Sequence, residues 1–479
     1  MTPFYLRGFL APVPDETDAF DLPVTGALPP ELTGRYLRNG PNPLPGRDPG
    51  HWFAGPGMVH GVRLRDGRAE WYRNRWVRTS AFTNGAPFVR DDLSVDLAAV
   101  PANTHVVPHG NRILALVESG LPYELTPELE TVGPCDFGGL LTTAMTAHPK
   151  RDPVTGELLF FGYGFRPPYL TYHRLSADGR LVESREIRVP GPTMMHDFAI
   201  TTGHVVWMDL PVVFDMGLAA TGGMPYRWDD RYGARLGVMP RAGATAGTEP
   251  AEPTAGTNPT TGTGPTTGTG PTDATDATDA TDATDVIWFD IDPCYVFHTA
   301  NAHEDLSGRV VLDAVRYAPA AFAAVWEEIG GDADPAAAAA AKGAARLHRY
   351  VLTPGAGVRE ESLDDLDVEF PTLNDCRTGD RNRYLYAVSA EAIVKYDVRT
   401  GASAVHRVRP DRMPGEAVFV PGREAHGEDE GWLLSIVTGG PGIASELLVL
   451  DASDLSPVAS VRLPRRVPAG FHGSWISDA

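Results

Sequence analysis

Short strand-like runs separated by turn signals fill most of the chain, and this pattern restricts the fold to the all-β class. In the clearest instance, residues 58–65 and 68–78 flank the dipeptide Asp66-Gly67. This dipeptide favours a type I′ turn, because both of its positions require a positive φ. We therefore expect an antiparallel hairpin here.

A looser strand–turn–strand unit recurs along the chain. Leu125 and Leu175 occupy matching places in two such units and are 50 residues apart, and Tyr396 and Leu450 are 54 residues apart. These spacings are close to the roughly 40 to 50 residues of one four-stranded propeller blade. The repeat predicts a β-propeller.

Two segments read as helices. Residues 319–329 place Phe322, Val325, Trp326 and Ile329 at i, i+3, i+4 and i+7, which is the spacing of one apolar helix face. Residues 335–348 begin with a proline after Asp334 and continue through an alanine run of high helix propensity. We expect helices at both places.

Residues 242–285 hold no aromatic residue, no base and no aliphatic residue larger than alanine. Such a segment cannot bury enough apolar surface to offset its ordering entropy, so we expect a disordered low-complexity insertion. Propellers commonly reach this length as one unit, and residues 1–479 are therefore expected to form a single domain.

The composition excludes several classes of protein. The net charge of -21 disfavours nucleic acid as a partner, because that affinity depends largely on basic side chains. No apolar run is long enough to span a bilayer and the first residues lack a secretory signal, so we expect a cytoplasmic protein. The three cysteines are far apart and predict buried, reduced thiols rather than disulfides. No obligate protein partner is indicated.

Four histidines stand in short, distinctive local sequences. They are found in Ala-His-Pro-Lys, Met-Met-His-Asp-Phe, Val-Phe-His-Thr-Ala-Asn-Ala and Pro-Ala-Gly-Phe-His-Gly-Ser-Trp, as His148, His196, His298 and His472. A further segment, residues 28–43, reads Leu-Pro-Pro-Glu-Leu-Thr-Gly-Arg-Tyr-Leu-Arg-Asn-Gly-Pro-Asn-Pro. Together these motifs resemble the carotenoid cleavage oxygenase family across nearly the whole chain.

The resemblance implies a seven-bladed β-propeller with a short helical and loop cap over one Fe(II) ion on its axis. The ion would be held by the four histidines, with O₂ as co-substrate and no other cofactor. Four neutral imidazoles leave two positions of an octahedral ion open, unlike the common site of two histidines and one carboxylate. The remaining histidines considered, His105, His109 and His303, are assigned no role at the metal.

The same resemblance assigns roles to further residues. Glu118, Glu369 and Glu416 would accept hydrogen bonds from the ligand imidazoles and fix their orientation. Thr104 would crowd one open coordination position. Three aromatic residues would line an apolar tunnel for a lipophilic polyene: Phe53, Phe297 and Phe370.

The function implied is oxidative cleavage of one C=C bond in a carotenoid or apocarotenoid, giving two carbonyl products. A stilbene dioxygenase is the first alternative, although Val117 stands where the stilbene-cleaving relatives have a lysine. A non-catalytic binding propeller is the second. The apolar stripe of residues 319–329 also predicts a peripheral, hydrophobic membrane contact.

Overall fold

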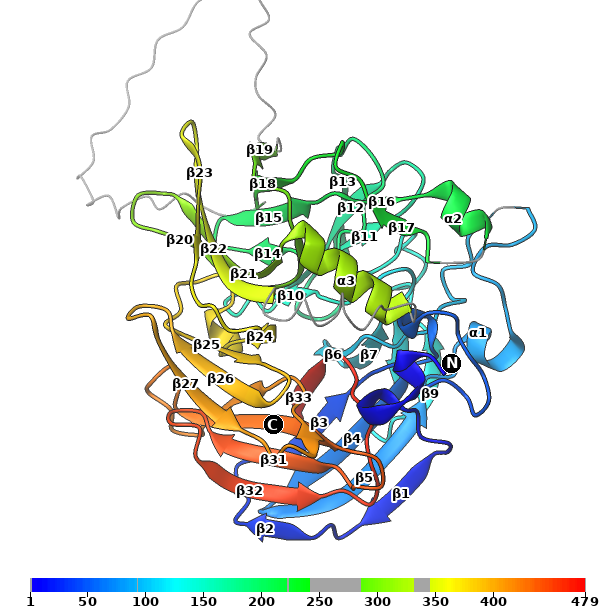
Figure 1. Cartoon of the computed structure of the whole chain (residues 1–479), viewed down its shortest axis with the longest axis vertical. Coiled ribbons are helices and arrows are strands. Elements are labelled where there is room, and N and C mark those ends of the chain that lie inside the picture. The colour runs from blue at the N-terminus through cyan, green and yellow to red at the C-terminus, as the bar shows by residue number, and fades with distance from the viewer. Residues whose placement is uncertain (1, 93, 222–223, 242–285, 331–344, 479) are drawn as a thin grey trace, which may run out of the picture.

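Seven β-sheets arranged around a common axis form the body of the chain that the computed structural model describes, so the fold is a seven-bladed β-propeller (Figure 1). The structure describes residues 2–92, 94–221, 224–241, 286–330 and 345–478. The predicted insertion, residues 242–285, lies outside them. All-β architecture and blade number are as the sequence predicts.

The first four blades follow one another along the chain. Blade 1 contains β6 (His105–His109), β7 (Arg112–Leu116), β8 (Tyr123–Leu125) and β9 (Thr131–Pro134). Blade 2 contains β10 (Lys150–Arg151), β11 (Leu158–Tyr163), β12 (Leu170–Leu175) and β13 (Leu181–Glu186). Blade 3 contains β14 (Ala199–Ile200), β15 (His204–Asp209), β18 (Arg235–Pro240) and β19 (Ile287–Asp290), and blade 4 contains β20 (Tyr295–Glu304), β21 (Val310–Tyr317), β22 (Ala345–Thr353) and β23 (Gly357–Ser362).

The last three blades include the ends of the chain. Blade 5 contains β24 (Glu369–Thr372), β25 (Tyr384–Val388), β26 (Ala392–Asp397) and β27 (Ala402–Arg407). Blade 6 contains β28 (Arg412–Met413), β29 (Val418–Pro421), β30 (Gly431–Gly439), β31 (Glu446–Asp451), β32 (Pro457–Arg462) and β2 (Val24–Gly26). Blade 7 contains β33 (Gly473–Ser477), β3 (Gly34–Arg38), β4 (Met58–Arg65), β5 (Arg68–Trp76) and β1 (Thr17–Phe20).

Blade 7 closes the ring, because it joins both ends of the chain. The C-terminal strand β33 pairs with β3, with Arg38 opposite Gly473, and β2 adds to the outer edge of blade 6 by pairing with β32. In a closed ring of blades only the short outer edge of each blade stays unpaired. The inner ends of all seven blades are therefore held around one axis.

The sequence patterns account for the local structure of the blades. Asp66 and Gly67 have φ values of 48° and 72° and connect β4 to β5, which confirms the predicted hairpin. The repeat also holds, since Leu125, Leu175 and Tyr396 lie on the third strand of blades 1, 2 and 5.

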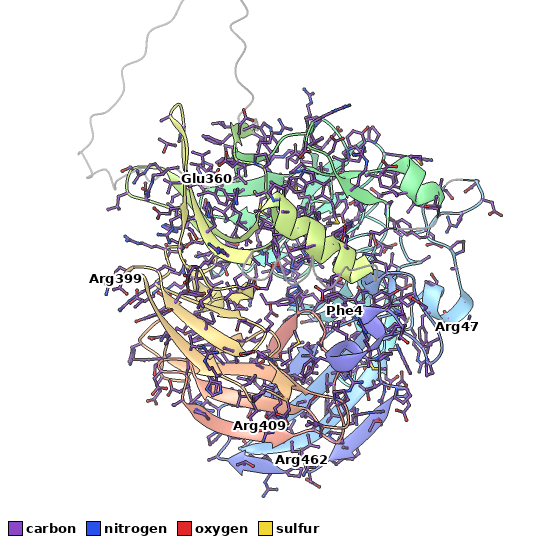
Figure 2. The ribbon with its side chains drawn as sticks, in the orientation of Figure 1. Phe4, Arg47, Glu360, Arg399, Arg409 and Arg462 are labelled. Atoms are coloured by element: carbon purple, nitrogen blue, oxygen red, sulfur yellow. The ribbon has the colours of Figure 1, made fainter. Side chains whose placement is uncertain are left out.

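Apolar side chains fill the spaces between neighbouring blades. Between blades 2 and 3, the rings of Phe161 and Trp207 lie 6.0 Å apart, and between blades 5 and 6 the rings of Tyr386 and Phe419 stack at 5.9 Å. Arg399 and Arg462 project from the outer rim in Figure 2. Cys135 and Cys294 are buried as expected, but Cys376 is exposed, so the expectation of buried thiols was wrong for it.

Helix α3 (Pro319–Gly330) confirms the first predicted helix and lies across one face of the propeller (Figure 1). Phe322 and Ile329 are buried, and Phe322 packs on Tyr295 and Trp228. The apolar stripe therefore faces the propeller. A membrane contact stays a prediction, and it cannot rest on this stripe.

Short helical turns lie beside α3 or on the loops. They are η1 (Phe4–Leu6), η2 (Gly8–Leu10), η3 (Trp52–Ala54), η4 (Asp375–Arg377), α1 (Ser80–Asn84) and α2 (Met216–Ala220). A separate two-stranded sheet follows β15 in the chain and contains β16 (Val212–Phe214) and β17 (Tyr226–Trp228). Within the described residues, none of the helices is both long and apolar enough to cross a bilayer.

The second predicted helix, residues 335–348, was wrong at its C-terminal end. Residues 345–348 form the start of β22, where Ala345 pairs with Tyr317 and Leu347 with Val315. Pairing with a buried neighbouring strand overrides the helix propensity of the alanine-rich sequence. The rest of that segment lies outside the described residues.

Candidate metal centre

The four predicted histidines meet on the propeller axis because each lies at the inner strand of a different blade. His148 comes two residues before β10 and His196 three residues before β14. His298 lies within β20, and His472 directly precedes β33. Blades 2, 3, 4 and 7 thus each direct one imidazole at the same point.

The four side chains are buried and in mutual contact. The ligand atoms of His148, His196 and His298 all lie within 4.8 Å of one another, and the Nε2 atoms of His148 and His196 are 3.1 Å apart. The ring of His472 lies 4.6 Å from that of His148 and 4.7 Å from that of His298, centroid to centroid. Residues more than 300 positions apart thus form one cluster.

The protonation state of three of the four histidines suits a metal. Burial, followed by the neighbouring histidines, lowers the pKa of His148, His298 and His472 well below the usual value, so these imidazoles are neutral. Burial also lowers the pKa of His196, but the nearby carboxylates of Glu118, Asp197 and Glu369 together outweigh it, so the pKa is raised. Neutral imidazole is the form that binds a transition metal.

One nitrogen of the cluster indicates a missing ligand. Nε2 of His298 is buried and has no hydrogen-bond partner among the described residues. Leaving a buried polar group unpaired costs about 1 to 3 kcal/mol, so such groups normally have partners. A metal ion on the axis would satisfy it, and the residues present therefore fit the group that the sequence predicts.

Three carboxylates contact the Nδ1 atoms of three of the imidazoles. Oε1 of Glu118 contacts Nδ1 of His196, Oε2 of Glu369 lies 2.5 Å from Nδ1 of His298, and Oε1 of Glu416 lies 2.9 Å from Nδ1 of His472. A carboxylate accepts the Nδ1 hydrogen and leaves Nε2 free to bind a metal. The structure thus places all three predicted glutamates beside predicted ligands.

Each carboxylate is itself anchored through its second oxygen. Tyr163 donates to Glu118 Oε2 and Tyr317 to Glu369 Oε1, each at 2.7 Å, and the backbone N–H of Gly473 donates to Glu416 Oε2 at 2.7 Å. The two tyrosines were missed from the sequence. Their signal would have been an aromatic residue on an inward-facing strand position, which does not distinguish them from ordinary core residues.

Burial raises the pKa of two of these carboxyl groups. For Glu369 and Glu416, removal from water is the largest effect and raises the pKa to about 7 in each case. Backbone N–H donors at Phe370 and Gly473 oppose this effect, because they stabilise the charged form. Such shifts are common where carboxylates support a functional site.

The predicted tunnel residues lie at different distances from the cluster. Phe370 stacks on His298 at 5.1 Å with an interplanar angle of 29°, and Phe297 meets His196 edge-on at 5.1 Å. Phe53 instead packs on Phe471 at 5.6 Å and belongs to the layer beneath α3. Two of the three aromatics therefore contact histidines of the cluster directly.

A cavity of about 250 Å³ opens beside Phe370. Glu369 of blade 5 and Glu416 of blade 6 line it. Apolar side chains from α3 and from the strands of these two blades also line it, including Val325, Val388 and Met413. A mostly apolar cleft with a few polar groups is typical of a ligand site. The cavity thus reaches the two carboxylates that contact His298 and His472.

Thr104, His105 and His109, which the sequence analysis also considered, lie in different environments. Thr104 is buried and its carbonyl oxygen accepts from the backbone N–H of His472 at 3.3 Å, which puts it beside the cluster. Both ring nitrogens of His105 are engaged, by Ala147 O at 3.0 Å and Ser474 Oγ at 3.1 Å. Nε2 of His109 bonds to the carbonyl of Ser176 at 2.8 Å.

Comparison with known proteins agrees with this geometry. The family model described as retinal pigment epithelial membrane protein matches residues 10–260 and 274–477. A carotenoid cleavage oxygenase of Mycobacterium tuberculosis is 40% identical over 98% of this chain and 97% of its own length. The match to this relative covers all seven blades.

Two crystal structures share the whole fold. Lignostilbene dioxygenase of Pseudomonas brassicacearum is 27% identical, with a TM-score of 0.79 over 100% of this chain and 99% of that one. The cobalt-substituted apocarotenoid oxygenase of Synechocystis is 25% identical, with a TM-score of 0.77 over 97% of both chains. The chain is therefore an enzyme that belongs to the carotenoid cleavage oxygenase family.

Proposed function

We propose that this enzyme is an Fe(II)-dependent dioxygenase that cleaves one C=C bond of a carotenoid or apocarotenoid. The observation that carries the proposal is the cluster of four buried imidazoles, three of them oriented by carboxylates. The metal would be held by His148, His196, His298 and His472, one ion per chain.

The reaction balances without a further reductant. Both atoms of O₂ are inserted across one C=C bond, the carbon–carbon bond breaks, and two carbonyl products form. When bound, Fe(II) would supply the activation of O₂, for which four neutral ligands leave two coordination positions open. All four proposed ligands are histidines, and none of them is a carboxylate.

The protein's own residues would bind and orient the polyene. Phe370 and Phe297 cover faces of the cluster and present apolar surface next to it. The cavity beside Phe370 would receive part of the chain, next to the carboxylates of Glu369 and Glu416. Thr104, held against His472, would restrict one open position on the metal, and Phe53 would line the more distant part of the path.

A stilbene is the second candidate substrate, because lignostilbene dioxygenase shares the fold over the full chain. Val117 argues against it. This side chain is apolar and buried at 7% exposure, and no ammonium is available there to meet a substrate phenol. We therefore favour a polyene without a phenol group.

The test is anaerobic loading with Fe(II), followed by exposure to ¹⁸O₂ with a panel of carotenoids, apocarotenoids and stilbenes. Mass spectrometry of the carbonyl products gives the substrate and the cleaved bond. We expect labelled aldehydes or ketones from the first two classes only. Cleavage of stilbenes alone would select the second candidate, and no product from any class would contradict the proposal.

A further inference from the structure

Asp197 directly follows the proposed ligand His196, and its carboxylate is fully engaged by four donors. Oδ1 accepts from the backbone N–H of Phe198 at 2.7 Å and forms a salt bridge with Lys150 Nζ at 2.8 Å. Oδ2 accepts from the backbone N–H of Thr299 at 2.8 Å and lies 2.8 Å from the Thr299 hydroxyl. The side chain is buried, with 1% exposure.

The donors belong to the neighbours of two other proposed ligands. Lys150 lies two residues after His148 in blade 2, and Thr299 directly follows His298 in blade 4. Asp197 itself stands in blade 3. One carboxylate therefore connects three adjacent blades at the three places where they carry a histidine.

The strand that carries His298 is irregular at this contact. The register of β20 against β21 shifts between Val296 and Thr299 and again between Thr299 and Asn301. Irregularities of this kind bend a strand and redirect its side chains. The bond from the Thr299 N–H to Asp197 fixes the backbone at that irregular point, one residue from the His298 imidazole.

We propose that Asp197 is a positioning residue for the metal centre, whose carboxylate sets the relative placement of His148, His196 and His298. The assignment rests on the proposed function, because it takes the three histidines as metal ligands. A buried ion pair is often close to neutral for stability when compared with apolar packing. An ion pair that only stabilised the fold would not need to connect three blades at the positions of the proposed ligands.

The experiment compares Asp197→Asn with a matched buried pair elsewhere. An asparagine keeps the size of the side chain but replaces one accepting oxygen with an NH₂ group, which cannot accept from either set of donors. The control is Asp313→Asn. Asp313 is 2% exposed and pairs through both oxygens with Arg349 at 2.7 Å, between β21 and β22 of blade 4.

The readout is anaerobic titration of the full-length apoprotein with Co²⁺, by visible d–d absorption and by competition with a chelator, together with the melting temperature. We expect Asp197→Asn to weaken Co²⁺ binding about 10- to 100-fold, the scale seen when groups that orient ligands are removed, and to shift the absorption bands. Asp313→Asn should lower the melting temperature and leave the affinity and the bands unchanged.

Thr299→Val provides a milder test, since it removes only the hydroxyl and keeps the backbone N–H. It should weaken Co²⁺ binding by less than Asp197→Asn does, and it decides the matter if Asp197→Asn does not fold. The assignment would be overturned if Asp197→Asn bound Co²⁺ with the affinity and absorption bands of the wild type. If Asp197→Asn does not fold, the same result in Thr299→Val would overturn it. So would an equal loss of affinity in Asp313→Asn. Wild-type protein that takes up no Co²⁺ would overturn the metal centre itself, and this assignment with it.

Discussion

Tyr317 holds Glu369 in place: its phenol donates to Oε1 at 2.7 Å, while Oε2 of the same carboxylate lies 2.5 Å from Nδ1 of His298. The chain of contacts runs from β21 through β24 to a proposed ligand in β20. Tyr163 of blade 2, Glu118 after the second strand of blade 1 and His196 of blade 3 repeat the arrangement. In each case the tyrosine fixes the orientation of the imidazole through the glutamate that lies between them.

Removing the phenol oxygen of Tyr317 should weaken metal binding. In Tyr317→Phe the carboxylate of Glu369 loses one of its anchors, and hydrogen bonds to charged groups contribute about 1.5 to 3 kcal/mol. We expect a loss of Fe(II) affinity of several-fold or more, measured by chelator competition under anaerobic conditions. Tyr350→Phe is the control, because Tyr350 is another buried tyrosine of blade 4, and its hydroxyl contacts Cys294. An unchanged affinity in Tyr317→Phe would remove this tyrosine from the site.

Glu369→Gln and Glu416→Gln should each weaken iron retention or turnover by roughly 10- to 100-fold. An amide oxygen is a weaker acceptor for the imidazole N–H than a carboxylate is. Iron content after dialysis and steady-state turnover provide the measurement, and Glu430→Gln at an exposed loop site of blade 6 is the control. Variants indistinguishable from wild type would show that these two carboxyl groups do not orient the ligands.

Deleting residues 242–285 should leave iron content and turnover nearly unchanged. The segment joins β18 to β19, which are paired antiparallel with Val238 opposite Ile287, so a short turn can connect them. Loop-closure entropy changes only slowly with loop length. Turnover of the shortened chain, compared with the full chain at equal iron loading, checks this. A large loss would mean that the insertion takes part in substrate capture.

Phe322→Ala should destabilise the protein by about 3 to 5 kcal/mol, the usual cost of removing a fully buried aromatic ring. The ring is 1% exposed and packs on Tyr295 at 4.6 Å, below α3. Chemical unfolding monitored by tryptophan fluorescence gives the change in unfolding free energy. Glu327→Ala, at an exposed position of the same helix, should alter it by less than about 0.5 kcal/mol. Similar values for the two variants would place Phe322 outside the core.

The parts of this structure that could be predicted from sequence are those with a local signal. A two-residue turn such as Asp66-Gly67 and a helical apolar stripe are determined within a few residues. The four histidines and three glutamates are recognisable because each stands in a short, family-specific sequence. The structure brings all seven together.

The parts that could not be predicted depend on contacts between distant residues. Tyr163 and Tyr317 reach their glutamates across 45 and 52 residues, and Asp197 reaches Thr299 across 102. Nothing in the adjacent sequence marks these partners. Residues 345–348 show the converse, because their helical propensity gives way to pairing with β21, a contact that local sequence does not reveal.

Iron content of the anaerobically reconstituted protein tests the central claim most directly. We predict one Fe per chain in the wild type and a sharp loss of iron in each of His148→Ala, His196→Ala, His298→Ala and His472→Ala. Circular dichroism should be unchanged in these variants, since the blades are held together by their own cores. The four-histidine centre would be contradicted by a His148→Ala variant that keeps one iron per chain.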